Sequence, residues 1–378
     1  MYADPMSRPT AARKPLRIGL LTHHNPYDRR AFSGTVYFAA KALEQNPDVA
    51  LSILGPHRPP HPLDRLLRRK SPRITLNDVS LDGLDAVVGL VASHLLDPLL
   101  AQAPDIPVIH VTDATPAFLR DVYGWNVPLE ADASETRVAA KASATVYSSE
   151  VMANRAAADL GLPGFHPGVV PFGVNIDTLP KAPARKPSLN KLHLLFVGLD
   201  WQRKGGDIAV AALNRLRAAG VDAHLTIVGR CPPAVLQNPA VTYLGFLNKN
   251  RTRDAARLNA LYARSHLLVL PSRGDCTPMV VTEAMAFGTP VIGSDVGGIG
   301  AMIGGAGAGR VMAPDATPED WFRAICDCTA NIEAYRMMSD AAFDRTRTTL
   351  SWTRWADGIE RTAREIVVGR TQSIRIVA

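Results

Sequence analysis

The sequence is poor in the features that would anchor a chain in a membrane, staple it with disulfides or build a zinc site. It contains no run of about 18 apolar residues, and residues 1–16 contain no apolar stretch of about 7–15 residues typical of a signal peptide. We therefore expect a cytoplasmic protein whose residues 1–16 form a flexible tail. Its few cysteines form no Cys-x-x-Cys pair near a histidine group, so we expect neither a zinc site nor disulfides. They are Cys231, Cys276, Cys326 and Cys328.

Two ligand-binding motifs are also absent. No Asp-x-Asp metal motif occurs, and the nearest acidic pairing, at residues 82–85, has a different spacing and is typical of a turn. The glycine-rich segment 297–309, which we interpret as a loop, lacks Gly-x-Gly-x-x-Gly, the fingerprint of dinucleotide-binding folds. We expect no metal and no cofactor.

The charge balance is basic. The formal net charge is +7 and the isoelectric point is about 9.4. This excess fits an anionic ligand, or peripheral contact with an anionic membrane at its inner face. It fits equally well a scatter of surface arginines without a function. The basic residues form no single block and no nucleic-acid motif is present, so we do not expect nucleic acid binding.

Continuously apolar strands alternate with helical patterns along the chain. Strands without polar alternation are typical of parallel sheets covered by helices on both faces. In the first half we expect strands at 17–22, 49–55, 86–93, 108–113, 144–149 and 168–173, with helices including 35–45 and 150–160. In the second half we expect strands at 193–198, 224–229, 241–245, 266–272 and 290–295, with helices at 207–219, 254–265, 278–287 and 353–368.

Two consecutive series of this kind predict an α/β fold with two doubly wound, Rossmann-like domains facing a cleft. The polar, proline-bearing segment 181–190 is typical of a linker. The expected divisions are a tail at 1–16, an N-terminal domain at 17–182, a linker at 183–190, a C-terminal domain at 191–350 and a closing helix at 351–378 that crosses back to the first domain.

The segment 271–290, PSRGDCTPMVVTEAMAFGTP, is the strongest functional signal. A strand is followed by a polar turn with Asp275, and a helix that starts near Pro278 carries Glu283 eight positions after the aspartate. The start of a helix offers unpaired N–H groups and a partial positive charge, which suits a phosphate or a sugar hydroxyl. A carboxylate on that helix can accept two hydrogen bonds from a ribose diol. A plain strand, turn and helix with solvated acids is the alternative.

A second signal is the segment 196–207, FVGLDWQRKGGD. The strand ends in Gly198, and the cations Arg203 and Lys204 precede two glycines and a helix. Glycines let a backbone approach a ligand closely, and two cations can neutralise a diphosphate. A solvated basic turn is the alternative interpretation.

The segment 271–292 resembles the Glu-x7-Glu signature of the retaining glycosyltransferases of family four, a large group with the GT-B fold. Its Glu-Ala-Met-Ala at 283–286 and Gly-Thr-Pro-Val-Ile at 288–292 match that family's text. The resemblance implies that Glu283 binds the donor ribose, that Asp275 binds donor-sugar hydroxyls, and that backbone amides near the start of the helix face the sugar and phosphate. The run is Thr277, Pro278, Met279 and Val280, and because proline has no N–H the donors are the amides of Thr277, Met279 and Val280.

Three positions depart from the family pattern. Asp275 replaces the first glutamate, Leu199 replaces an early arginine after Gly198, and Ala301 stands where a glutamate usually follows the glycine pair at 297–298. Lys204 matches the family's diphosphate-binding lysine, and we expect Arg203 to supply the missing second cation.

In the N-terminal half the resemblance implies two further site segments. Ser33, Gly34 and Thr35 open a helix where relatives place a glycine-rich loop beside the donor phosphates. Asp113 stands where many relatives place a histidine over the donor sugar. His110 is an odd number of residues away on the same strand and should point to the opposite face.

The predicted function is metal-independent transfer, with retention of configuration, of a sugar from a UDP- or GDP-sugar to a glycan, lipid-linked or small-molecule acceptor. Asp113, Lys204 and Arg203 are the expected catalytic residues. Two alternatives remain: a sugar-nucleotide epimerase on the same fold, and a sugar-nucleotide-binding protein that has lost catalysis. The departures at Asp275 and Leu199 allow the last alternative, and the retention of Glu283, Lys204 and the 271–292 segment argues against it.

Overall fold

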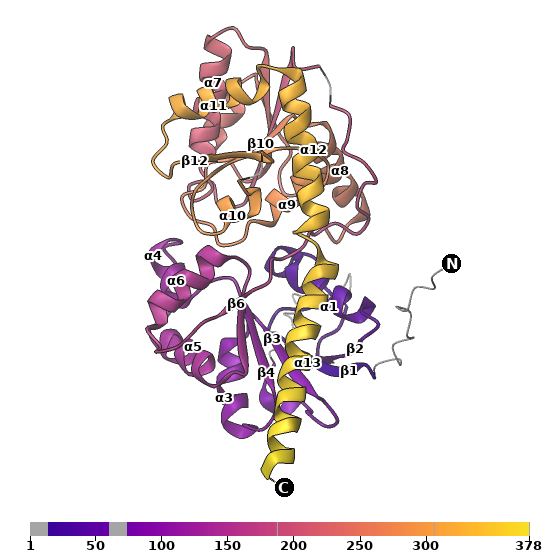
Figure 1. Ribbon diagram of the computed structural model, residues 1–378. Coiled ribbons are helices and arrows are strands. Elements are labelled where there is room, and N and C mark those ends of the chain that lie inside the picture. The colour runs from indigo at the N-terminus through magenta and orange to yellow at the C-terminus, as the bar shows by residue number, and fades with distance from the viewer. Residues whose placement is uncertain (1–13, 60–73, 187, 306, 378) are drawn as a thin grey trace, which may run out of the picture.

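The computed structural model describes residues 14–59, 74–186, 188–305 and 307–377, with side chains described up to residue 369. The first thirteen residues of the predicted tail lie outside this description. Two lobes stack along the long axis of the molecule, each built around a parallel sheet (Figure 1). None of the described helices is long and apolar enough to cross a membrane.

The N-terminal lobe contains a six-stranded parallel sheet in the order β2-β1-β3-β4-β5-β6. Its strands are β1 (Leu16–Leu21), β2 (Val49–Leu54), β3 (Ala86–Leu90), β4 (Val108–Thr112), β5 (Ala144–Tyr147) and β6 (Gly168–Val169). Its helices are α1 (Thr35–Gln45), α3 (Ser93–Gln102), α4 (Pro116–Asp121), α5 (Glu130–Lys141) and α6 (Glu150–Leu160). Strands β3 and β4 are buried along their whole length, as their unbroken apolar sequences predict.

The C-terminal lobe repeats this plan with the strand order β12-β11-β10-β7-β8-β9, again wholly parallel. Its strands are β7 (Leu192–Gly198), β8 (Ala223–Gly229), β9 (Val241–Tyr243), β10 (Leu267–Leu270), β11 (Val291–Ser294) and β12 (Gly309–Met312). Its helices are α7 (Gly206–Ala218), α8 (Thr252–Arg264), α9 (Met279–Met285), α10 (Ile299–Ile303), α11 (Pro318–Thr329) and α12 (Ile332–Thr348).

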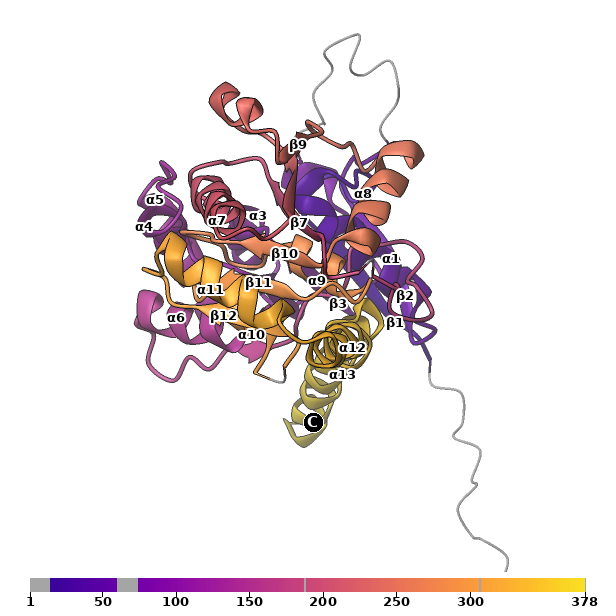
Figure 2. The same ribbon diagram turned by 90° about the horizontal axis from the view of Figure 1, so that it is seen from above.

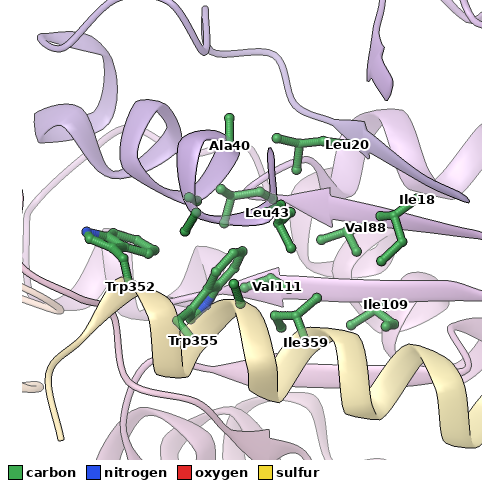
Figure 3. Close-up of a cluster of buried hydrophobic side chains, with 14 of the residues drawn as sticks. Ile18, Leu20, Ala40, Leu43, Val88, Ile109, Val111, Trp352, Trp355 and Ile359 are labelled. Atoms are coloured by element: carbon green, nitrogen blue, oxygen red, sulfur yellow. The ribbon is translucent and has the colours of Figure 1, made fainter. Parts of the chain in front are cut away.

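The last helix, α13 (Trp352–Val377), returns to the first lobe. Figure 1 shows it running from the junction down the N-terminal lobe, and the view from above places it beneath α12 (Figure 2). Trp355 and Ile359 are fully buried against α1 and the strands β1, β3 and β4 (Figure 3). The apolar positions of this helix recur at helical spacing, so one face of it completes the N-terminal core.

The fold class predicted from the sequence is confirmed, with two local corrections. The strand expected at 168–173 is only two residues long, because the chain leaves the edge of the sheet after Val169 to reach the other lobe. The glycine-rich segment 297–309 is not a plain loop. It contains α10, whose Ile299 and Ile303 are fully buried, so two apolar side chains one helical turn apart outweigh the glycines around them.

Candidate functional site

Asp275 lies in the turn after β10 and is almost fully buried where the two lobes meet. One of its carboxylate oxygens is ion-paired with the Lys204 ammonium group, and the other accepts a hydrogen bond of 3.2 Å from the Tyr123 hydroxyl. The turn is held from behind by Gly297, whose φ of 52° and close contact with the Asp275 carbonyl leave no room for a side chain. The acidic residue predicted to meet the donor sugar therefore has a fixed position.

The two predicted cations approach the same turn from the loop between β7 and α7. Lys204 pairs with Asp275 directly, while Arg203 donates a 2.7 Å hydrogen bond to the Gly274 carbonyl. The Arg203 guanidinium lies 3.9 Å from the nearer Asp275 oxygen. Gly198, at the end of β7, passes so close to the Lys204 side chain that an added Cβ would lie 3.0 Å from its Cγ. The structure thus brings Gly198, Arg203, Lys204 and Asp275 together as the sequence predicts.

Asp113 follows β4 and faces this turn from the N-terminal lobe. It is buried, and burial together with the nearby Asp275 charge raises its pKa to about 6, although hydrogen bonds from Thr277 and Cys276 oppose the shift. Two carboxyl groups from opposite lobes thus lie near one another in a largely desolvated place. His110, three residues earlier, bonds instead to Glu135 on α5 at 2.9 Å, so the two side chains take opposite faces, as the strand alternation predicts.

Tyr123 is a site residue that the sequence did not reveal. It lies just after α4 in the N-terminal lobe, yet its hydroxyl reaches the C-terminal lobe, where it bonds to Asp275 and accepts the Cys276 backbone N–H at 2.9 Å. The Arg203 guanidinium stacks over its ring at 4.1 Å. A close approach of backbones at Gly274 fixes this contact, because a Cβ there would lie 2.7 Å from the Val122 carbonyl oxygen. That glycine was the only signal in the sequence.

Glu283 is buried in α9, on the other side of the junction. Its carboxylate is ion-paired with Lys249 and accepts a hydrogen bond of 2.8 Å from the Tyr262 hydroxyl. A small cavity between the lobes opens beside it, lined by Arg29, Asn175 and Asp177 of the first lobe and by Lys249, Asn259 and Glu283 of the second. Lys249 is the second residue that sequence reasoning missed, and no motif marks it.

Ser33 and Gly34 precede α1 and lie close to Lys249 of the other lobe. The Ser33 carbonyl accepts from Lys249 at 3.5 Å and from the Asn175 amide at 3.0 Å. Ser33 and Gly34 both adopt positive φ, 57° and 94°, while Thr35 is the buried first residue of the helix. The predicted phosphate loop therefore does reach the pocket that holds Glu283, through Lys249.

The start of α9 connects the turn that carries Asp275 to the part of the helix that carries Glu283. The Thr277 hydroxyl lies 2.7 Å from the Ser148 hydroxyl of the other lobe, and Pro278 is the N-cap of the helix. The Met279 side chain packs into the N-terminal core, and Val280 packs beside an apolar cluster of the C-terminal lobe. These last two side chains therefore brace the junction between the lobes, and only their backbone can serve the site.

This architecture, with parallel sheets in two lobes and polar side chains meeting between them, is that of the GT-B glycosyltransferases. Sucrose-phosphate synthase of Thermosynechococcus elongatus superposes on the chain with a TM-score of 0.72 at 18% identity, covering 94% of this chain and 100% of that structure. Alr3699/HepE of Anabaena, solved with UDP and glucose, superposes with a TM-score of 0.64 at 14% identity, covering 93% and 100%.

Sequence comparison identifies one domain of the chain. Residues 191–331 match the family model described as Glycosyl transferases group 1, so the chain carries a glycosyl transferases group 1 domain on a GT-B fold. Glycogen synthase of Mycobacterium tuberculosis is 30% identical over 230 residues, which is 57% of this chain and 53% of that protein. Phosphatidyl-myo-inositol mannosyltransferase of Mycobacterium leprae is 34% identical over 132 residues, 34% of this chain and 35% of that protein. The chain thus spans about half, or less, of these curated relatives.

Proposed function

We propose that the protein is a retaining, metal-independent glycosyltransferase that moves a sugar from a UDP- or GDP-sugar to an acceptor hydroxyl. The observation that carries this proposal is the junction itself. Asp113 of one lobe faces Asp275, Lys204 and Arg203 of the other, and Glu283 lines a cavity between the lobes. Each is a position that the family resemblance assigns to donor binding or catalysis.

In this proposal the ion pairs within the protein hold the charged side chains until the donor binds and replaces these contacts. Glu283 exchanges part of its pairing with Lys249 for the ribose hydroxyls, and Lys204 and Arg203 turn toward the diphosphate. Asp275 then accepts hydrogen bonds from sugar hydroxyls in place of those it now accepts from Tyr123 and Lys204. Because each carboxylate is buried and held by neighbours, little reorganisation is needed when charge develops on the leaving diphosphate.

Retention is proposed by analogy with the family, and the roles of the two acids indicate the route by which it occurs. A double displacement needs a carboxylate nucleophile beneath the anomeric carbon. Asp275 is assigned to a sugar hydroxyl, which leaves Asp113. With its pKa raised to about 6, Asp113 suits a hydrogen bond to the sugar or to the acceptor hydroxyl. We propose front-face attack, in which the acceptor oxygen forms its bond to the anomeric carbon as the carbon–phosphate oxygen bond breaks, and a leaving phosphate oxygen takes the proton.

The test is donor turnover with and without acceptor. UDP- and GDP-sugars are screened for binding by calorimetry, and the donors that bind are incubated with glycogen, phosphatidylinositol and inositol phosphate as acceptor probes. Release of nucleoside diphosphate that depends on acceptor, with the sugar found on the acceptor in its original anomeric configuration in EDTA, supports the proposal. An epimerised donor without transfer would identify an epimerase. Binding without any turnover would identify a binding protein, and an inverted product would contradict the proposed mechanism.

A further inference from the structure

Four histidines gather at one end of the N-terminal sheet. His23 and His24 follow β1, His57 follows β2, and His94 lies in the first turn of α3, which follows β3. Because β2, β1 and β3 are neighbours in a parallel sheet, the residues after their carboxyl ends meet. The ring centroids of His23 and His24 are 3.8 Å apart, and those of His23 and His94 are 4.9 Å apart. We call these four residues the histidine cluster.

Most of the hydrogen-bonding capacity of this cluster is unused. His57 bonds through Nε2 to the Thr22 carbonyl at 2.9 Å, and His23 bonds to the Val91 backbone. Within the described residues, the rings of His24 and His94 make no hydrogen bond. The His23 and His94 side chains are exposed, so a ligand can reach them.

The cluster also has no negative partner within the part of the chain that the structure describes. Burial lowers the pKa of all four imidazoles, and neighbouring imidazoles lower those of His23 and His24 further, the latter to about 4. The Glu135 carboxylate, which contacts Ser93 at the start of α3, is already hydrogen-bonded to the Ser93 hydroxyl and to His110. A neutral imidazole has one N–H, which His57 already uses toward Thr22 and His23 toward the Val91 backbone, so His24 and His94 are the two rings whose N–H can turn toward a ligand.

The backbone around the cluster is strained. Among the described residues other than glycine, only Phe32, Ser33 and Val91 have positive φ, at 46°, 57° and 50°. All three adjoin the cluster: the Phe32 ring stacks on His24 at 5.2 Å, Ser33 follows it, and Val91 bonds to His23. Such conformations cost about 1–3 kcal/mol each and concentrate at functional sites. The first two backbone amides of α3, at Ser93 and His94, donate no hydrogen bond within the described chain, as is usual for the first turn of a helix.

The cluster adjoins the donor pocket. Ser33 accepts from Lys249, and Lys249 pairs with Glu283, so two contacts link the strained segment to the carboxylate proposed for the ribose. A ligand on the histidine cluster would therefore lie on the N-terminal side of a bound donor.

We propose that the histidine cluster binds a phosphate group of the acceptor. The inference rests on the proposed function only in identifying the ligand as the acceptor. Converging N–H donors, unpaired helix amides and the absence of a competing carboxylate together suit an oxyanion better than a neutral hydroxyl. The phosphate can belong to a soluble phosphomonoester or to a lipid headgroup.

The experiment measures binding of inorganic phosphate to the full chain by calorimetry, at fixed pH, in three proteins. These are the wild type, the double variant His24→Gln/His94→Gln and the control His166→Gln, whose histidine lies in the loop after α6. We expect the double variant to bind phosphate at least tenfold more weakly, with the control unchanged. Glutamine keeps a hydrogen-bonding group at both positions, neither of which is fully buried, and an unchanged melting temperature shows that the fold is intact.

Donor binding separates this proposal from the proposed function. The double variant should bind UDP or GDP as the wild type does, and the phosphate result stands whether or not transfer is found. Equal phosphate binding by the wild type and the double variant would overturn the proposal. Binding of Zn²⁺ to the histidine cluster with loss of phosphate binding would overturn it as well.

A vesicle arm identifies the source of the phosphate. Sedimentation with phosphatidylcholine vesicles is compared with and without phosphatidic acid, which carries a phosphomonoester. Because the imidazoles are neutral, His→Gln changes leave the non-specific attraction of this basic protein for anionic vesicles unaltered. Loss of vesicle binding in the double variant assigns a lipid phosphate, and loss of inorganic phosphate binding alone assigns a soluble one.

Discussion

Replacing Glu283 by glutamine tests the donor site at its most buried carboxylate. The side chain is 1% exposed, carries the charge that pairs with Lys249, and accepts from Tyr262. Glutamine has nearly the same shape but no charge, and one of its two terminal atoms donates where the carboxylate accepted. The change therefore removes charge and acceptor capacity without opening a cavity.

The magnitude follows from the contacts that the carboxylate would make to a ribose diol. A hydrogen bond to a charged group contributes about 1.5–3 kcal/mol. Glutamine keeps one acceptor, so we expect the loss of roughly one such bond. Since about 1.4 kcal/mol is a factor of ten in affinity, the dissociation constant of UDP or GDP should rise about tenfold to a hundredfold.

The assay is calorimetric titration of the nucleoside diphosphate found to bind the wild type. Glu333→Gln is the matched control, because that carboxylate is exposed on α12 and pairs only with its neighbour Arg336. The Glu283 variant also leaves Lys249 without its partner, so its melting temperature is measured alongside. A variant that is less stable but binds the nucleotide as tightly as the wild type would refute the reasoning, because Glu283 would then be a structural residue.

Three further changes test other parts of the molecule. The pKa of Asp113 is about 6 against an ordinary 3.8, so between these values the folded state binds more protons than the unfolded state, and stability falls as pH rises. Asp113→Asn should therefore increase the free energy of unfolding at pH 7.5 by roughly 3 kcal/mol at most, and raise the melting temperature with it. This advantage should be lost near pH 4, and a difference in stability that does not change with pH would contradict the reasoning. Lys204→Ala leaves the buried Asp275 with only Arg203 nearby and should weaken both kcat and nucleotide affinity, while Lys191→Ala, at an exposed position, should leave both unchanged. Trp355→Ala should lower the free energy of unfolding in urea by about 3–5 kcal/mol, because the ring is fully buried. The exposed Val368→Ala should lower it by less than about 0.5 kcal/mol, and equal effects would show that α13 does not support the N-terminal core.

The sequence was sufficient for the fold because its strands are unbroken apolar runs. Helices such as α1 and α6 begin and end at the predicted residues, since each is bounded by clear turn or capping residues such as Ser149, which accepts from the Met152 N–H. The strand predicted at 168–173 was too long, because β6 has only two residues, and the helix α10 was not predicted. At both places the structure is decided by packing against distant segments, which no local pattern records.

The same distinction separates the site residues that were found from those that were not. Asp275, Lys204 and Glu283 stand within motifs whose spacing belongs to one element and its turn, so a single stretch of sequence identifies them. Tyr123 acts across the junction of the lobes, where its partner Asp275 is 152 positions away, and Lys249 pairs within its own lobe with Glu283, 34 positions away. Both contacts join separate segments that only the folded structure brings together, so no single stretch of sequence identifies them.

That junction also explains why buried charge is tolerated here. Asp275 and Glu283 are nearly inaccessible, yet each is paired with a lysine and hydrogen-bonded to a tyrosine hydroxyl. A buried ion pair of this kind contributes little net stability, because the cost of desolvating both charges offsets much of their attraction. Exchanging the lysine or the tyrosine for a ligand that offers cations or hydroxyls in the same positions is therefore nearly neutral in energy. A site built from such pairs can therefore bind a charged, hydroxyl-rich donor without first breaking strongly stabilising contacts.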